Sequence, residues 1–389
     1  MRPSYEGSVE CYAEGSLDQI GNGIYRRLYS GVNYRLGSFA GGRFAHLSRP
    51  VSIMFELTLR CNARCIHCDI WKNRGKEDSP GFDGWSRVLK DMRAWLGPIS
   101  IVFTGGEALL QPYALDLVSY ATSLGFHLEI LTHGYWQDQP RIEKLALSGA
   151  SRITVSLDGV GELHNEIRGR AKFFERTNRS IETLVRIRKE RQLPFQILLK
   201  TVIMDKNLDG VCDVARYATS RGVDVFYQPI HQNYNTAHDP DWFRKPGNWP
   251  RDIGKAISVV EDLIRLKRSG LNIANTERQL EVMIPYFRDP ATEGALSESQ
   301  VAHEANPMCS ALTTAMFESN GDVRICSRRD PIGNIKEKAF REIWESRPPH
   351  WELGCCLFER RGEAKPEWRE SELLTIQDAR EQPAAGSLQ

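Results

Sequence analysis

The chain has 389 residues, with 51 Lys and Arg against 50 Asp and Glu, 41% hydrophobic residues and 9 cysteines. The hydrophobic fraction is high enough for a buried core, which excludes a wholly disordered chain, and the net charge of +1 gives no general attraction to nucleic acid. No apolar run approaches the ~20 residues that cross a bilayer, and the first thirty residues lack a secretory signal. We therefore expect a cytoplasmic protein with no nucleic-acid or membrane partner.

Short apolar runs alternate with helical patterns in the first two thirds of the chain. They predict strands at 52–58, 99–104, 127–132, 152–157, 196–203 and 223–229, with helices near 85–96, 112–124, 140–147, 177–191 and 210–221. Six such units imply a parallel sheet, either a curved partial β/α barrel or a flat doubly wound sheet. In both folds, ligands bind at the carboxyl ends of the strands.

The rest of the chain predicts a smaller second region. Residues 236–250 form a Pro/Gly/Asp-rich break, and apolar residues at helical spacing follow from 253 to 264. Asn320-Gly321 joins two short strands at 315–318 and 322–325, because Asn-Gly favours a tight hairpin turn. The expected parts are an N-terminal extension (1–50), a β/α core (51–235), a linker with helices (236–300), a small hairpin and helix domain (301–362) and a polar tail (363–389).

Three cysteines directly follow the first predicted strand. Cys61, Cys65 and Cys68 stand at spacings of four and three, so their thiolates can converge on one face of a metal cluster. Three cysteines leave one iron of a [4Fe–4S] cluster open to a substrate or cofactor. The alternative is a zinc site completed by His67 or by a fourth cysteine. Zinc knuckles usually combine Cys-x2-Cys with a distant second pair, so the spacing favours iron and sulfide.

The cysteine triplet and three later stretches together resemble the radical S-adenosylmethionine (SAM) superfamily over roughly residues 51–235. The stretches are Thr-Gly-Gly-Glu from 104, Leu-Thr-His-Gly from 131 and Ser-Leu-Asp-Gly from 156. The resemblance implies a partial (β/α)6 barrel whose [4Fe–4S] cluster binds SAM. It also implies reductive cleavage of SAM to a 5′-deoxyadenosyl radical, with electrons from a flavodoxin or ferredoxin.

The same resemblance implies a set of SAM-binding residues at the strand ends. Glu107 holds the methionine ammonium, and the two preceding glycines allow backbone to approach the ligand. Ser156 contacts the ribose or methionine, and Arg168 is directed toward the SAM carboxylate, with a solvated arginine as the alternative. His133 stands where the family often has Asn. The predicted set is Gly105, Gly106, Glu107, Thr132, Ser156, Asp158 and Arg168.

A second cysteine group surrounds the predicted hairpin. Cys309, Gly321 and Cys326 form a Cys-x11-Gly-x4-Cys pattern that resembles the start of the SPASM or twitch domain of radical SAM enzymes. With Cys355 and Cys356, the resemblance implies one auxiliary [4Fe–4S] cluster. Adjacent cysteines point apart in extended backbone, so either both bind through a turn or one is free. A free thiol is either an inert spare or a hydrogen donor, as an epimerase needs.

The substrate is predicted from the segment after the sixth strand. Its amides, together with His231, Tyr234 and Asp239, suit a polar substrate, although an ordinary polar loop has the same composition. We expect dehydrogenation of a small aminocyclitol or sugar, with the auxiliary cluster as electron acceptor. The alternatives are an epimerase, a peptide or protein maturase, and a non-catalytic iron–sulfur or zinc scaffold. The candidate catalytic residues are Cys355, Cys356, His231, Tyr234 and Asp239.

Overall fold

The computed structural model describes residues 15–38, 47–73, 78–233, 239, 241–244, 247–290, 313–326 and 329–347. Four of the predicted site residues lie outside the described residues: Tyr234, Cys309, Cys355 and Cys356. Their roles, and the domain boundaries given above, remain predictions.

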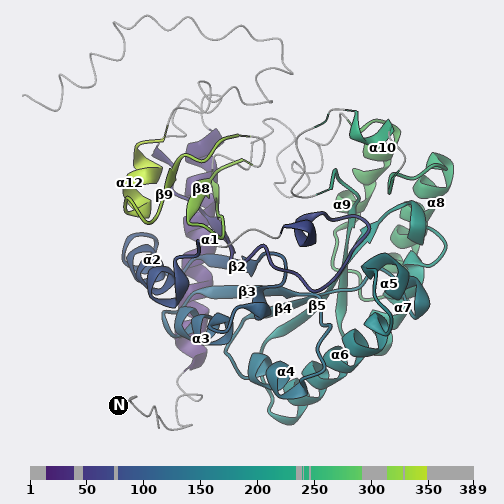
Figure 1. The fold of residues 1–389 in the computed structure, drawn as a ribbon, viewed down its shortest axis with the longest axis horizontal. Helices are drawn as coiled ribbons and strands as arrows, with labels where there is room; N and C mark the ends of the chain where they lie inside the picture. The colour runs from purple at the N-terminus through teal and green to yellow at the C-terminus, as the bar shows by residue number, and fades with distance from the viewer. Residues whose placement is uncertain are drawn as a thin grey trace, which may run out of the picture. The chain divides into compact units, whose positions relative to one another are not determined.

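Six parallel strands form the core sheet. They are β1 (Ser52–Glu56), β2 (Ser100–Thr104), β3 (His127–Thr132), β4 (Arg152–Ser156), β5 (Gln196–Ile203) and β6 (Asp224–Pro229). Their spatial order, β6-β5-β4-β3-β2-β1, follows the chain without a reversal. A doubly wound sheet reverses its order at a switch point, so this order is that of a β/α barrel. The predicted partial barrel is confirmed, and all six strands agree with the prediction to within two residues (Figure 1).

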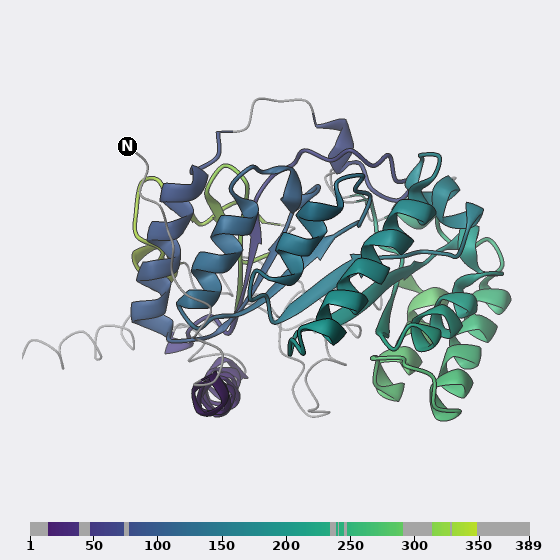
Figure 2. The same cartoon turned by 90° about the horizontal axis from the view of Figure 1, so that it is seen from below.

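Helices follow the strands and lie along one face of the sheet (Figures 1 and 2). They are α2 (Gly81–Leu96), α3 (Ala114–Ser123), α4 (Gln139–Ala146), α5 (Glu162–Arg168), α6 (Phe173–Glu190), α7 (Val211–Ser220), α8 (Ile253–Arg268), α9 (Glu277–Glu281) and α10 (Met283–Arg288). Short 3-10 turns are η3 (Ile70–Lys72), η4 (Ala108–Leu110), η5 (Asp205–Asn207) and η6 (Trp242–Arg244). The short helix α5 is absent from the prediction, because its seven residues give too little periodicity.

The predicted N-terminal extension contains a long helix, α1 (Gly15–Ser38). The Tyr25 hydroxyl donates to the carbonyl of Leu96 at 2.6 Å, and the Tyr29 hydroxyl donates to the carbonyl of Pro50 at 3.0 Å. These bonds fasten the helix to the end of α2 and to the segment before β1. The sequence pattern missed α1 because the helix presents little apolar periodicity.

The predicted hairpin joins the core sheet instead of standing apart from it. Its strands are β7 (Thr314–Phe317) and β8 (Asp322–Arg324), followed by β9 (Gly333–Asn334) and helix α12 (Phe340–Glu345). Strand β7 pairs in parallel with β1, in the register Phe55 to Phe317. Those two rings are buried and meet edge to face at 4.7 Å. Burial of this aromatic contact explains why the hairpin extends the barrel sheet.

Candidate active site

The three cysteines of the first group lie on one loop after β1. Cys65 is buried, while Cys61 and Cys68 are half-buried, and all three pack around Ala63 and Phe173. All three cysteines therefore belong to the same small cluster of packed side chains.

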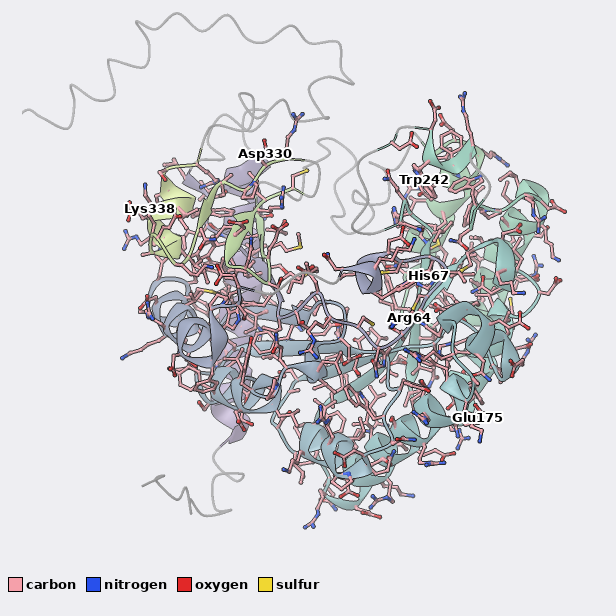
Figure 3. The ribbon with its side chains drawn as sticks, in the orientation of Figure 1. Arg64, His67, Glu175, Trp242, Asp330 and Lys338 are labelled. Carbon is pink, nitrogen blue, oxygen red and sulfur yellow. The ribbon has the colours of Figure 1, made fainter. Side chains whose placement is uncertain are left out.

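The loop's own side chains brace its backbone. The Arg64 guanidinium donates to the carbonyls of Cys61 at 3.1 Å and Ala63 at 2.7 Å, and the Trp71 indole donates to the carbonyl of Cys65 at 3.2 Å. Figure 3 labels Arg64 and His67 on this loop.

The end of α5 fixes the cysteine loop from the other side. The backbone amide of Arg64 donates to the carbonyl of Arg168 at 2.9 Å, and that of Ile66 donates to the carbonyl of Ile167 at 3.0 Å. Gly169 follows with φ of +65°, and a Cβ there would collide with the carbonyl of Arg64. A glycine is therefore required at this close approach.

Burial keeps the metal-free thiols protonated. It raises the pKa of Cys61 to about 12 and that of Cys68 to about 11, and it also raises the pKa of Cys65. A metal cation reverses this preference because thiolate, not thiol, is the ligand. Three neighbouring thiols, with the buried guanidinium of Arg168 beside Cys65, suit an iron–sulfur cluster. The donor set therefore fits the group that the sequence implies.

The Gly-Gly-Glu turn packs against the segment that leads into the cysteines. The amide of Gly106 donates to the carbonyl of Thr58 at 2.7 Å, and that of Glu107 donates to the carbonyl of Arg60 at 2.9 Å. A Cβ on Gly105 or Gly106 would overlap these neighbouring carbonyls. The two glycines therefore allow the backbone that leads into the cysteine loop to approach closely. The sequence alone did not indicate this role.

The Glu107 side chain is buried and accepts several hydrogen bonds. Its donors are the Thr132 hydroxyl at 2.9 Å, the His133 amide at 2.8 Å and the Leu109 amide at 3.3 Å. Burial raises the pKa of Glu107 to about 7, while these bonds oppose the shift. A cation placed against this carboxyl would hold it ionised. Glu107 and Thr132, both predicted site residues, are thus in direct contact.

His133 connects the end of β3 with the cysteine loop. The amide of Tyr135 donates to its Nδ1 at 3.0 Å, so Nδ1 carries no proton and Nε2 is the donor. That Nε2 lies 2.7 Å from Asn62 Oδ1 and 3.2 Å from Glu107 Oε2. Burial lowers the pKa of His133 well below its usual value, which keeps the ring neutral. The sequence marked the position as unusual but did not indicate this bond.

Asp158 and Arg168 form a buried ion pair beneath the cysteine loop. Arg168 Nη2 lies 2.6 Å from Asp158 Oδ2, and Arg168 Nη1 donates to Cys65 Sγ at 3.5 Å. Burial raises the pKa of Asp158, but the guanidinium and the amide of Val202 together hold it below its usual value. Arg168 is only 7% exposed, so the alternative of a solvated arginine is wrong.

Two histidines, the buried His164 and the half-buried His67, lie near this pair. His164 Nδ1 accepts from the amide of Asp158 at 3.1 Å. Within the described part of the chain, His67 Nδ1 and Arg168 Nε have no hydrogen-bond partner. Unpartnered polar atoms beside three thiols are compatible with a bound group at this position.

Ser156 is half-buried at the end of β4, where it pairs in register with Lys200 of β5. Burial lowers the pKa of Lys200, against the opposing effect of Glu129 and Asp158. Sequence reasoning missed this lysine. The available signal was a charged residue inside an otherwise apolar strand.

The predicted substrate segment is described only in part. The ring of His231 lies 5.5 Å from that of Tyr286, and the Asp239 amide donates to Gln232 at 3.0 Å. Cys326 follows β8 and is half-buried.

No cluster of three or more His, Cys, Asp or Glu side chains that could hold a single metal ion occurs among the described residues. In the same part of the chain, no helix combines the length and hydropathy needed to cross a membrane.

Comparison with known families decides the assignment. Residues 55–218 match the radical SAM superfamily, and residues 309–368 match an iron–sulfur cluster-binding domain, SPASM. The chain carries a radical SAM domain and a SPASM iron–sulfur domain. It is therefore a radical SAM enzyme whose cofactors are SAM and [4Fe–4S] clusters, and the zinc scaffold alternative is not supported.

Similar proteins include two curated heme synthases and one peptide maturase. The AdoMet-dependent heme synthase of Methanosarcina barkeri is 27% identical over 78% of this chain and 84% of its own length. That of Oleidesulfovibrio alaskensis is 28% identical over 75% of this chain and 74% of its own. The sporulation killing factor maturation protein SkfB of Bacillus subtilis is 28% identical, over 46% of this chain and 42% of its own.

Solved structures share the fold of this radical SAM enzyme. SAM-bound SuiB of Streptococcus suis has a TM-score of 0.56 at 17% identity, and the match covers 78% of this chain and 68% of SuiB. At that identity the likeness concerns the fold alone.

Proposed function

We propose that this chain is a radical SAM oxidoreductase that removes two electrons from an iron tetrapyrrole. When bound, the first cluster and SAM supply a 5′-deoxyadenosyl radical that abstracts a substrate hydrogen. A SPASM cluster, when bound, would take the electron left on the substrate, and a flavodoxin or ferredoxin would supply the reducing electron. The main support for radical SAM chemistry is the contact between the cysteine loop and the Gly-Gly-Glu turn, because it joins the proposed cluster site to the proposed SAM site.

In this proposal, residues of the chain bind SAM at the strand ends. Glu107 holds the ammonium of SAM, and Thr132 keeps the carboxylate oriented through its hydroxyl, 2.9 Å away. Ser156 faces the ribose or methionine. The burial of Glu107 excludes water from this contact, which strengthens it.

The substrate class rests on the relatives and on one group of side chains. The two heme synthases resemble this chain over three quarters of its length at 27% and 28% identity, against 23% for the subtilosin biosynthesis protein AlbA of Bacillus subtilis over a similar length. Trp242, Phe243 and Trp249 are half-buried and contact one another. The ring of Trp249 lies 5.4 Å from that of Trp242 and 5.4 Å from the buried ring of Tyr286. Such aromatic faces suit stacking against a flat macrocycle better than a sugar.

The aromatic group is tied to the cysteine loop. Asn248 Nδ2 donates to the carbonyl of Ile66 at 2.8 Å, and the amide of Asp205 donates to the carbonyl of Asn248 at 2.9 Å. A macrocycle stacked on Trp249 would therefore lie next to the loop that carries the first cluster. Figure 3 labels Trp242 in this segment. The aminocyclitol or sugar expected from the sequence has no support from the named relatives.

A substrate comparison tests this function. The reconstituted enzyme is given SAM, dithionite and either an iron tetrapyrrole or a panel of peptides, under anaerobic conditions. We expect 5′-deoxyadenosine and a tetrapyrrole product that is lighter by two hydrogens, or by CO2 and two hydrogens. Trp249→Ala should weaken tetrapyrrole binding by at least tenfold. Leu147→Ala, an exposed position remote from the site, is the control. Oxidation of a peptide with no change in the tetrapyrrole would replace this proposal by a maturase.

A further inference from the structure

The Arg168 side chain contacts a cluster ligand directly. Its Nη1 donates to Cys65 Sγ at 3.5 Å, within the range of hydrogen bonds to sulfur, and both residues are buried. Cys65 is the middle cysteine of the triplet and the most buried of the three. The contact joins the end of α5 to the loop after β1, 103 residues apart in the chain.

Asp158 fixes the direction of this guanidinium. Arg168 Nη2 lies 2.6 Å from Asp158 Oδ2, and Asp158 Oδ1 accepts from the amide of Val202 at 3.0 Å. The Asn207 side chain in turn donates to the Asp158 carbonyl at 2.8 Å. Residue Asp158 is thus held by β5 through its carboxylate and by the following turn through its carbonyl. The guanidinium therefore cannot swing away without leaving a buried charge unpaired.

We propose that Arg168 is a positioning residue that raises the reduction potential of the first cluster through its hydrogen bond to Cys65. Reduction adds negative charge to a cluster, and an N–H donor and a cation beside a ligand sulfur stabilise that added charge. One electron from the external reductant enters the cluster, and no bond to Cys65 forms or breaks. SAM cleavage needs the reduced cluster. The contact therefore favours reduction of the cluster, the step that precedes SAM cleavage.

This role differs from the one that the family resemblance implies, in which Arg168 binds the SAM carboxylate. A cluster role predicts an effect in protein that holds no SAM, whereas a SAM role predicts an effect on SAM affinity alone. The inference does not depend on the substrate. Its failure is therefore separate from a failure of the tetrapyrrole proposal.

The test is a redox titration of the reconstituted full chain, monitored by EPR, without SAM. The first cluster is identified as the signal that changes when SAM is added afterwards. For Arg168→Gln we expect about a tenfold lower ratio of reduced to oxidised cluster at one fixed potential, which is about 59 mV for one electron. Arg168→Lys keeps the charge but loses the directed N–H, so its potential falls less, in the same direction.

Arg170→Gln is the matched control. Arg170 is exposed and donates through Nε to the Asn62 carbonyl of the same loop, without contact to a sulfur. Its loss should leave the potential unchanged. If Arg168→Gln fails to retain iron, the potential measured for Arg168→Lys is used to test the proposal. An unchanged potential in the Arg168 variant that holds iron, with weaker SAM binding, overturns the proposal.

Discussion

The imidazole of His133 donates from Nε2 to Asn62 Oδ1 across 2.7 Å, which joins the end of β3 to the cysteine loop. Asn62 lies between the first two cysteines, so a residue of the third strand positions the loop of the first. The family often has Asn at the position of His133, and an Asn side chain is too short to span the same gap.

His133→Asn should therefore lower the free energy of unfolding of the metal-free protein by about 1–3 kcal/mol, because buried donors and acceptors lose partners. A double-mutant cycle with Asn62→Ala, measured by urea unfolding, isolates the pair. We expect a coupling energy of about 0.5–3 kcal/mol. Strict additivity of the two substitutions would mean that the contact does not stabilise the loop.

The buried carboxyl of Glu107 should make SAM binding depend on pH. Burial raises its pKa to about 7, and the ammonium of SAM binds the ionised form. Affinity should rise as the pH approaches about 7 and fall again above about 8, where an α-amino group loses its proton. In the absence of SAM the same group stabilises the fold at acidic pH, and this stabilisation is lost as the pH rises through about 7.

Isothermal titration at several pH values measures this dependence, with Glu107→Gln as the comparison. The glutamine variant should bind SAM more weakly at about pH 7 and above, and it should lose the rise below pH 7. An unaltered pH profile in that variant would assign the ammonium to another group.

Gly106→Ala should prevent the cysteine loop from closing on the Gly-Gly-Glu turn. Its Cβ would overlap the carbonyl of Arg60, which is backbone and cannot move aside. We expect loss of more than half of the iron that the first site retains, together with lower thermal stability. Gly31→Ala is the control, because nothing lies within 4 Å of its Cβ and alanine favours a helix by roughly 1 kcal/mol. Equal iron retention in both variants would contradict the packing argument.

Iron analysis tests the number of clusters. The second cysteine group has four members, Cys309, Cys326, Cys355 and Cys356, so the reconstituted chain should hold about eight irons. The variant with Cys61, Cys65 and Cys68 all changed to Ala should hold about four. If Cys355 and Cys356 both bind iron, either Ala variant damages only the auxiliary cluster. Retention of full iron by one of them would identify a free thiol and restore the epimerase alternative.

Features that depend on residues close together in the sequence were predictable, and features that depend on residues far apart in the sequence were not. The six strands were predictable because each is a short, nearly continuous apolar run, and Cys61, Cys65 and Cys68 because they share one loop. The pairing of β7 with β1 was not, since Phe55 and Phe317 are distant in the sequence and their contact exists only after folding.

The finer contacts of the site follow the same rule. Arg168 was a predicted residue, but its bond to Cys65 joins two elements whose approach no local pattern specifies. The sequence also did not show why residue 106 must be glycine. The group that excludes a side chain there is the carbonyl of Arg60, which follows a different strand.

The most direct test of the account is whether the chain cleaves SAM reductively. With dithionite under anaerobic conditions, the reconstituted protein should convert SAM to 5′-deoxyadenosine. Cys65→Ala should abolish this product, while Cys212→Ala, outside both cysteine groups, should leave it unchanged. No 5′-deoxyadenosine from the iron-loaded protein, or S-adenosylhomocysteine as the main product, would contradict the assignment.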